Sequence, residues 1–182
     1  SNNKDDLMYI LLQKMYEREE KVAESVCQLQ FILNRYERYK EGNTTNTNIV
    51  KIFDRSIFED RLFAFHNLLD QPSVFEYYER LWREKVNELV YNVGTPKLYV
   101  ILDIKWDLFV KRLYERSRDI EINNFEKNKL YFQLLNQSYS QYLKNICDAY
   151  RIPYLVVDAS KPLTEKMNII MNKLKTLNIH NS

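Results

Sequence analysis

The sequence predicts an α/β fold in which a parallel sheet is flanked by helices. Stretches with helical spacing of apolar residues alternate with short runs of β-branched and aromatic residues, which is the pattern of strand and crossover-helix units. The run from Leu98 to Ile104 is apolar at nearly every position, as expected of a parallel strand buried on both faces. With 182 residues, 45% of them hydrophobic, the chain is long enough for one domain with a real core. We therefore expect residues 1–182 to form one α/β domain.

The apolar spacing predicts helices along most of the chain. Asp5 or Asp6 can cap the first, and Gly42 with the Asn/Thr tract after it is expected to end the second in an exposed loop. A long helix follows Pro72 and is closed by Gly94. Apart from the helix after Pro72, the predicted helices cover residues 5–16, 19–39, 57–69, 106–115, 125–150 and 163–174.

Three strands are predicted, at residues 49–53, 98–104 and 154–158. Parallel sheets of this class usually hold about five or six strands, so the sheet is expected to be incomplete. The connections inside the chain are too short to hide further strands. We therefore expect the missing strands to precede Ser1.

Composition excludes several classes of protein. The net charge of +2 gives no general field for nucleic acid, and no apolar run reaches the roughly 18 residues that span a bilayer. Cys27 and Cys147 lie far apart and are read as buried thiols in a reducing compartment. The start of the chain does not have the form of a signal peptide. We expect a soluble cytoplasmic protein with no nucleic-acid or membrane partner.

The sequence Asp54-Arg55-Ser56 follows a predicted strand, at the edge where ligands of open α/β sheets bind. An acid there can hold a metal ion or accept a proton, and the adjacent guanidinium can stabilise a developing alkoxide or phosphate oxygen. The alternative is a helix N-cap with a surface ion pair.

Arg112, Arg116 and Arg118 lie at the end of a predicted helix, the first two one turn apart. Three converging guanidiniums suit phosphate oxygens, and an arginine-bearing lid neutralises a transferring phosphoryl group while it excludes water. The alternative is that these arginines favour the helix dipole and that Glu115 pairs with Arg112 or Arg118.

Gln28 and Arg35 are seven residues apart on one predicted helix, so they share a face that could reach a planar ligand. An amide and a guanidinium held by a carboxylate can read a base edge, and Asp60 could be that carboxylate. The alternative is two solvated positions on an amphipathic helix.

The remaining residue patterns give little support for a metal site, a serine nucleophile or a stacking surface. His66 and His180 have no partners at metal-ligand spacing, and no serine lies in a Gly-x-Ser-x-Gly elbow. The stripe of Tyr77, Tyr78 and Trp82 is read as core or dimer packing.

In their order and spacing these segments resemble the deoxyribonucleoside kinase family, which includes the deoxycytidine, deoxyguanosine and deoxyadenosine kinases. The resemblance covers most of the chain. It rests on Leu12-Gln-Lys-Met-Tyr16, on Gln28 with Arg35, on Asp54-Arg55-Ser56 with Asp60, on Arg112, Arg116, Arg118 and Glu121, and on Asp158 in the closing strand. One residue more than usual separates Tyr16 from Gln28, which leaves Glu17 as a lesser candidate for the sugar contact.

The resemblance implies a P-loop kinase-like fold that lacks its N-terminal strands here, with a lid at about residues 112–122. It implies transfer of the ATP γ-phosphoryl group to the 5′-hydroxyl of deoxyadenosine, deoxyguanosine or deoxycytidine with Mg²⁺, and a homodimer. A mitochondrial or viral origin stays open. The implied roles are the base for Gln28, Arg35 and Asp60, the sugar 3′-hydroxyl for Tyr16 and Glu121, the 5′-oxygen for Arg55, the phosphates for Arg112, Arg116 and Arg118, and Mg²⁺ through water for Asp54.

The chain departs from the family in one large respect. It contains no Gly-x-x-x-x-Gly-Lys-Ser/Thr loop for the ATP phosphates. The resemblance would place that loop, and a catalytic glutamate after the second strand, before Ser1. Two alternatives stay open: a non-catalytic nucleotide-binding or interaction subunit of the same fold, and a monophosphate kinase similar to thymidylate kinase.

Overall fold

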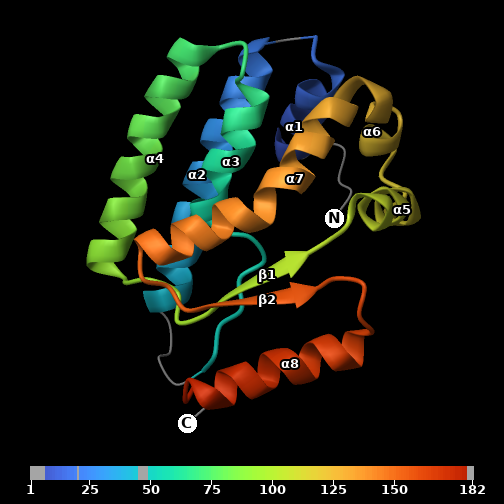
Figure 1. The fold of residues 1–182 in the computed structure, drawn as a ribbon. Coiled ribbons are helices and arrows are strands. Elements are labelled where there is room, and N and C mark those ends of the chain that lie inside the picture. Colours follow the sequence, from blue (N-terminus) through green and yellow to red (C-terminus); the bar gives the residue numbers. More distant parts are fainter. Residues whose placement is uncertain (1–6, 20, 45–48, 180–182) are drawn as a thin grey trace.

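The structure is a computed structural model and describes residues 7–19, 21–44 and 49–179. Figure 1 shows a two-stranded sheet with most of the helices on one face and α8 on the other. The helices are α1 (Leu7–Glu17), α2 (Lys21–Thr44), α3 (Ile57–Asn67), α4 (Pro72–Asn92), α5 (Trp106–Arg116), α6 (Asp119–Ile122), α7 (Phe125–Ala149) and α8 (Leu163–Thr176). The predicted helices are confirmed to within a few residues at most ends. The short helix α6 was not predicted.

The sheet pairs β1 (Tyr99–Asp103) with β2 (Tyr154–Asp158) in parallel, and Asp103 lies opposite Asp158. Both predicted strands are confirmed. The predicted strand at residues 49–53 is wrong, since none of these residues is in a strand and the Ile52 side chain is 90% exposed. A strand needs a neighbour for its peptide groups. Within the described residues the sheet contains only β1 and β2.

Two apolar clusters hold the helices together. The first joins α2, α3, α4 and the end of α7, and includes Ile32, Phe58, Tyr78, Trp82, Val86 and Leu89. The second joins α1, α2, α3, α5, α6 and α7, and includes Met15, Tyr16, Cys27, Leu62, Leu113 and Phe132. The aromatic stripe of α4 is divided, because Tyr78 and Trp82 are buried while Tyr77 is 75% exposed.

Gly42 does not end α2, as the sequence had suggested, because the helix continues to Thr44. A Cβ atom at Gly42 would lie only 2.5 Å from the ring of Phe53. The glycine therefore allows Phe53 to pack against the helix, where its ring centroid is 5.2 Å from that of Tyr39. Gly94 behaves as predicted, closing α4 with a φ of 97°.

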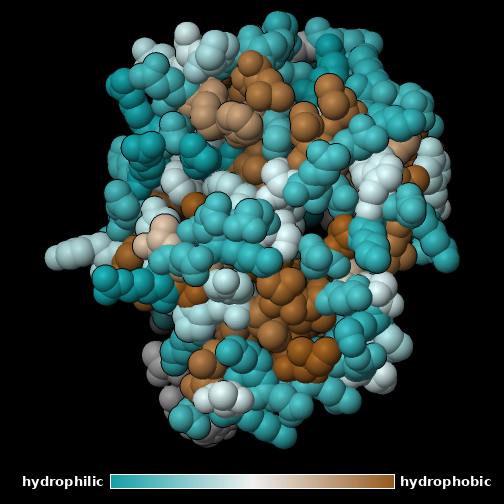
Figure 2. Space-filling model, viewed as in Figure 1, coloured by the Kyte–Doolittle hydropathy of each residue, from teal (hydrophilic) through white to brown (hydrophobic). Residues whose placement is uncertain are grey.

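No helix among the described residues combines the length and hydrophobicity needed to cross a membrane. Figure 2 shows apolar surface over the strands and α8 on one face, and Leu102 and Val156 of the strands are partly exposed. Additional strands before Ser1, and a homodimer, stay predictions. The proposed cap at Asp5 or Asp6 lies outside the described residues.

Candidate active site

The turn before α3 carries Asp54 and Arg55, both exposed at the surface. Arg55 has a φ of 68°, and its guanidinium lies 4.7 Å from the centre of the Phe63 ring. One of its nitrogens is 4.0 Å from a carboxylate oxygen of Glu59. Desolvation opposes the charge of Arg55, but Glu59 and then Tyr139 outweigh it and raise the pKa of the guanidinium. The turn thus presents a fixed cation next to an acid.

Arg35 on α2 forms an ion pair with Asp60 on α3. The exposed fraction of the side chain is 16% for Arg35 and 1% for Asp60. Burial lowers the pKa of Arg35, Glu59 opposes that effect, and the positive charge of Arg55 adds to it. The expected partner of Arg35 is therefore in place, and Arg35 lies within electrostatic range of Arg55.

Gln28 lies two turns before Arg35 on the same helix and is 1% exposed. Its Nε2 atom donates a hydrogen bond to the sulfur of Met15 at 3.4 Å. Its Oε1 atom is buried and has no hydrogen-bond partner among the described residues. A buried acceptor without a partner is rare in folded proteins and costs about 1–3 kcal/mol, so this oxygen is well suited to a ligand.

Tyr16 lies in the last turn of α1 and is buried. Burial raises the pKa of its hydroxyl far above the usual value, and Tyr131 and Glu121 raise it further. Arg55 and Arg116 act in the opposite direction. The hydroxyl therefore stays protonated, in a neighbourhood that includes charged residues from the α3 turn and from the lid segment.

Glu121 of α6 binds two of the predicted lid arginines. Its carboxylate forms ion pairs with Arg116 and, at 3.4 Å, with Arg118. Ser117 between the arginines is left-handed, with a φ of 52°, which lets the chain turn from α5 into α6. The carboxylate is nearly buried, whereas both arginine side chains are about half exposed.

Arg112 lies apart from this cluster. It donates a hydrogen bond of 2.7 Å to the carbonyl of Ala159, just after β2. Arg116 and Arg118 share Glu121 as a partner and Arg112 has a different one, so the convergence of all three guanidiniums on one anion stays a prediction. Glu115 pairs with Lys111, one turn away, at 3.7 Å, while Arg112 is bonded to Ala159 and Arg118 to Glu121.

Two hollows lie near these residues. Arg35, Arg38, Arg55 and Ser56 help to line a small notch of about 10 Å³. A cavity of about 480 Å³ lies between α1 and α6, and its lining includes Glu17 and Asp119. Of the two sugar candidates on α1, Glu17 lines this larger cavity and Tyr16 does not.

A model of the deoxynucleoside kinase family matches residues 2–178, almost the whole chain. The chain belongs to the deoxynucleoside kinase family. The predicted resemblance is confirmed.

Relatives of this deoxynucleoside kinase family member include the uncharacterized protein MG268 of Mycoplasma genitalium, 48% identical over 94% of this chain and 74% of that protein. Its homologue in Mycoplasma pneumoniae is 42% identical, over 96% of this chain and 76% of that protein. A deoxyguanosine kinase of Lactobacillus johnsonii is 26% identical, over 92% of this chain and 77% of that enzyme. No solved structure matches the chain significantly.

Glu59 is a site neighbour that the sequence analysis missed. It is 2% exposed, accepts hydrogen bonds from the Ser56 amide at 2.9 Å and from the Tyr139 hydroxyl, and faces Arg55. Ser followed three residues later by Glu is a capping pattern, so a signal was present. In this kinase family member the cap also fixes an acid beside the Arg55 guanidinium.

Asp54 was predicted to hold Mg²⁺ through water. Among the described residues no cluster of three or more His, Cys, Asp or Glu side chains could hold a metal ion. Mg²⁺ commonly keeps several waters and binds one or two carboxylates together with substrate phosphates. The single exposed carboxylate of Asp54 is compatible with that mode of binding.

Proposed function

We propose that this protein transfers the γ-phosphoryl group of ATP to the 5′-hydroxyl of deoxyadenosine, deoxyguanosine or deoxycytidine. Family membership supports a nucleoside kinase. The buried Gln28 Oε1 atom, which has no partner among the described residues, is the observation that carries the proposal to a nucleoside. An amide in this position offers an acceptor to an amino or ring N–H group of a base.

Gln28, Arg35 and Asp60 bind the base in this proposal. Asp60 holds the guanidinium of Arg35, and the planar fork then offers donors in a set direction. Thymine has a methyl group where these bases have none and a carbonyl in place of the amino group of adenine or cytosine. We therefore expect thymidine to be disfavoured.

Tyr16 and Glu121 bind the sugar 3′-hydroxyl in this proposal. The Tyr16 hydroxyl carries its proton at neutral pH, and burial raises its pKa further, so it can donate a hydrogen bond. The Glu121 carboxylate can accept one. Arg55 binds the 5′-oxygen, where a fixed positive charge stabilises the oxygen as its proton leaves.

Arg112, Arg116 and Arg118 bind phosphate oxygens in this proposal. In this structure Arg116 and Arg118 are held by Glu121, and Arg112 by the Ala159 carbonyl. Each must therefore exchange its partner for a phosphate when the lid, which we place at about residues 112–122, closes. Such an exchange neutralises the transferring group only when nucleotide is bound.

Asp54 would hold Mg²⁺ through water, and the ion, when bound, neutralises charge on the ATP phosphates. These 182 residues contain no Gly-x-x-x-x-Gly-Lys-Ser/Thr loop. We therefore assign to them the nucleoside site and the lid.

The test is carried out on the full-length protein, with any residues that precede Ser1 included, and measures transfer of labelled phosphate from ATP to each of the four deoxynucleosides in the presence of Mg²⁺. We expect transfer to at least one of deoxyadenosine, deoxyguanosine and deoxycytidine, and little to thymidine. Gln28→Ala should raise KM for the preferred nucleoside about tenfold, with KM for ATP little changed. Gln30→Ala is the matched control, since Gln30 lies on the same helix and bonds only to Asn34 among the contacts found.

Absence of transfer to all four nucleosides would overturn the proposal. Nucleoside binding by calorimetry without any transfer would overturn it in favour of a non-catalytic member of the family.

A further inference from the structure

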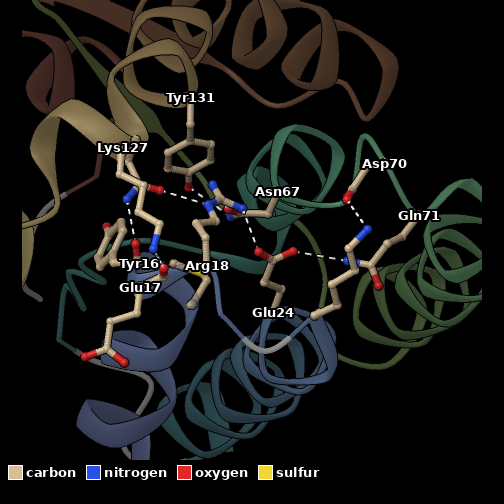
Figure 3. Close-up of polar contacts among 12 residues, drawn as sticks. Tyr16, Glu17, Arg18, Glu24, Asn67, Asp70, Gln71, Lys127 and Tyr131 are labelled. Carbon is tan, nitrogen blue, oxygen red and sulfur yellow. Dashed lines mark hydrogen bonds and ion pairs between the residues drawn. The ribbon is translucent and has the colours of Figure 1, made fainter.

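A buried polar cluster lies behind Tyr16, where α1, α2, α3 and α7 meet. We call it the Arg18 cluster, and its members are Arg18, Glu24, Asn67, Asn128 and Tyr131. Figure 3 shows the Arg18 side chain between Glu24, Asn67 and Tyr131. Glu24, Asn67 and Asn128 are each no more than 5% exposed. Buried polar groups in such numbers need a full set of partners.

Arg18 supplies one partner to each of Glu24, Asn67 and Asn128. Its Nε atom donates to Asn128 Oδ1 at 2.9 Å, and its two terminal nitrogens donate to Glu24 at 3.1 Å and to Asn67 at 2.9 Å. Its guanidinium carbon lies 5.2 Å from the centre of the Tyr131 ring. One side chain thus ties the end of α1 to three other helices.

Asn128 links the Arg18 side chain to the backbone of Tyr16. Because Arg18 takes the Oδ1 side of the amide, the Nδ2 side faces the carbonyl of Tyr16 and donates a hydrogen bond of 2.7 Å. Carbonyl groups in the last turn of a helix have no partner within the helix. Asn128 provides one for Tyr16, and Lys127 provides one for Glu17.

The backbone of Arg18 is itself unusual, with a φ of 56°. Arg18, Arg55 and Ser117 are the non-glycine residues of positive φ that lie within two positions of a proposed site residue. Such a conformation costs of order 1 kcal/mol or more and persists only where surrounding contacts impose it. At Arg18 the hydrogen bonds of the cluster are the side-chain contacts that surround this conformation.

We infer that Arg18, acting through Asn128, is a positioning residue that sets the place of Tyr16 and so controls recognition of the substrate 3′-hydroxyl. The inference rests on the proposed function, because it deepens the role given to Tyr16. Arg18 touches no substrate in this account. It fixes the backbone that carries the tyrosine, through the bond from Asn128 to the Tyr16 carbonyl.

The decisive variant is Asn128→Asp. It keeps the shape of the side chain and its attraction to Arg18, but it replaces the donor to Tyr16 with a carboxylate oxygen. We expect the preference for a deoxynucleoside over its 2′,3′-dideoxy analogue, measured as a ratio of kcat/KM values, to fall about tenfold, with KM for ATP unchanged. Arg18→Lys keeps the charge without the fork and should give a smaller loss.

Asn136→Asp is the matched control. Asn136 lies on the same helix and also donates to a backbone carbonyl, that of Ile104 at 2.8 Å, but far along α7 from Tyr16. It should leave the 3′-hydroxyl preference unchanged. A purely structural role for the Arg18 cluster would lower stability and reduce kcat/KM for both substrates equally, and that result would overturn the inference.

A second measurement does not depend on activity. Deuterium uptake at residues 13–19 should rise several-fold in Asn128→Asp and stay at the wild-type level in Asn136→Asp. Unchanged uptake in Asn128→Asp would overturn the inference whatever the kinetics. If the wild-type protein transfers no phosphate, the proposed function fails, while the uptake measurement still decides whether the Arg18 cluster positions Tyr16.

Discussion

Asp60 forms a buried ion pair with Arg35 across the contact between α3 and α2. The carboxylate is almost completely enclosed, while the guanidinium keeps some contact with water. Breaking a buried pair leaves one charge without compensation and costs about 3–5 kcal/mol, whereas replacing both partners with apolar residues is often nearly neutral. The contribution of this pair to the free energy of unfolding can therefore be measured by replacing one partner or both.

We predict that Arg35→Met lowers the free energy of unfolding by about 3–5 kcal/mol, because it strands the carboxylate of Asp60. The double variant Arg35→Met with Asp60→Leu should recover most of that loss. Urea unfolding followed by circular dichroism measures both. Both variants should raise KM for the nucleoside, since both remove the guanidinium fork.

Arg80→Met is the control for these variants, because the Arg80–Glu76 pair is exposed and should contribute less than about 1 kcal/mol. Equal losses in Arg35→Met and Arg80→Met would show that the Arg35–Asp60 pair is effectively in solvent.

The shared carboxylate of Glu121 leads to a prediction about the lid. Glu121→Gln keeps the shape of the side chain but removes the charge that holds Arg116 and Arg118. Local opening of the segment should become about tenfold more frequent, since a charge-assisted contact is lost. Limited trypsin digestion, with cleavage after Arg116 or Arg118 followed by mass spectrometry, should be faster to the same extent.

Glu115→Gln tests whether any lost acid in this segment has the same effect. Glu115 is exposed and pairs only with Lys111 among the contacts found. Cleavage rates in Glu115→Gln should match the wild type, and a Glu121→Gln rate no faster than this control would contradict a lid held by Glu121.

The local pattern of the sequence was sufficient for most of the fold. The continuous apolar run at β1, the helical spacing of α7 and the positive φ at Gly94 each depend on neighbouring residues in the chain. The pattern failed at residues 49–53, because an apolar run becomes a strand only beside another strand. Gly42 failed for a similar reason, since its role is set by Phe53, eleven residues away.

The residues of the site also include some that the local sequence pattern could predict and some that it could not. The Arg35–Asp60 pair followed from motif spacing, and Glu59 followed a capping pattern that could have been read. The Arg18 cluster had no signal in the sequence, because the bonds from Arg18 to Asn67 and Asn128 span 49 and 110 residues. The direction of Arg112 toward Ala159 was also set by the sheet and not by the local helix.

Burial of the two thiols gives a prediction for alkaline pH. Burial raises the pKa of Cys147 from 9.0 to about 11 and that of Cys27 from 9.0 to about 12. The unfolded chain therefore loses thiol protons at a lower pH than the folded protein, so these groups stabilise the fold fully below pH 9 and less as the pH rises above it. Each thiol should remove on the order of 1 kcal/mol between pH 8 and pH 10.

Urea unfolding at pH 8 and pH 10 measures this loss, and the double variant Cys27→Ala with Cys147→Ala should show a smaller one. The thiols should also resist alkylation at pH 8 until urea is added. Rapid labelling of the folded protein would contradict the burial of both side chains.

His66 gives the opposite dependence, on the acid side. Its Nε2 atom is 3.1 Å from the Ser138 hydroxyl, its Nδ1 atom is buried without a partner among the described residues, and burial lowers its pKa below the usual 6.5. The folded protein therefore takes up this proton at a lower pH than the unfolded chain, so the stabilisation is complete above pH 6.5 and is lost as the pH falls.

We expect the urea midpoint to fall between pH 7 and pH 5, and to fall less in His66→Gln, which keeps a polar side chain but does not titrate. His180 is the only other histidine in the chain. Equal shifts in the wild type and in His66→Gln, with His180→Gln as the parallel control, would assign the acid sensitivity to other groups.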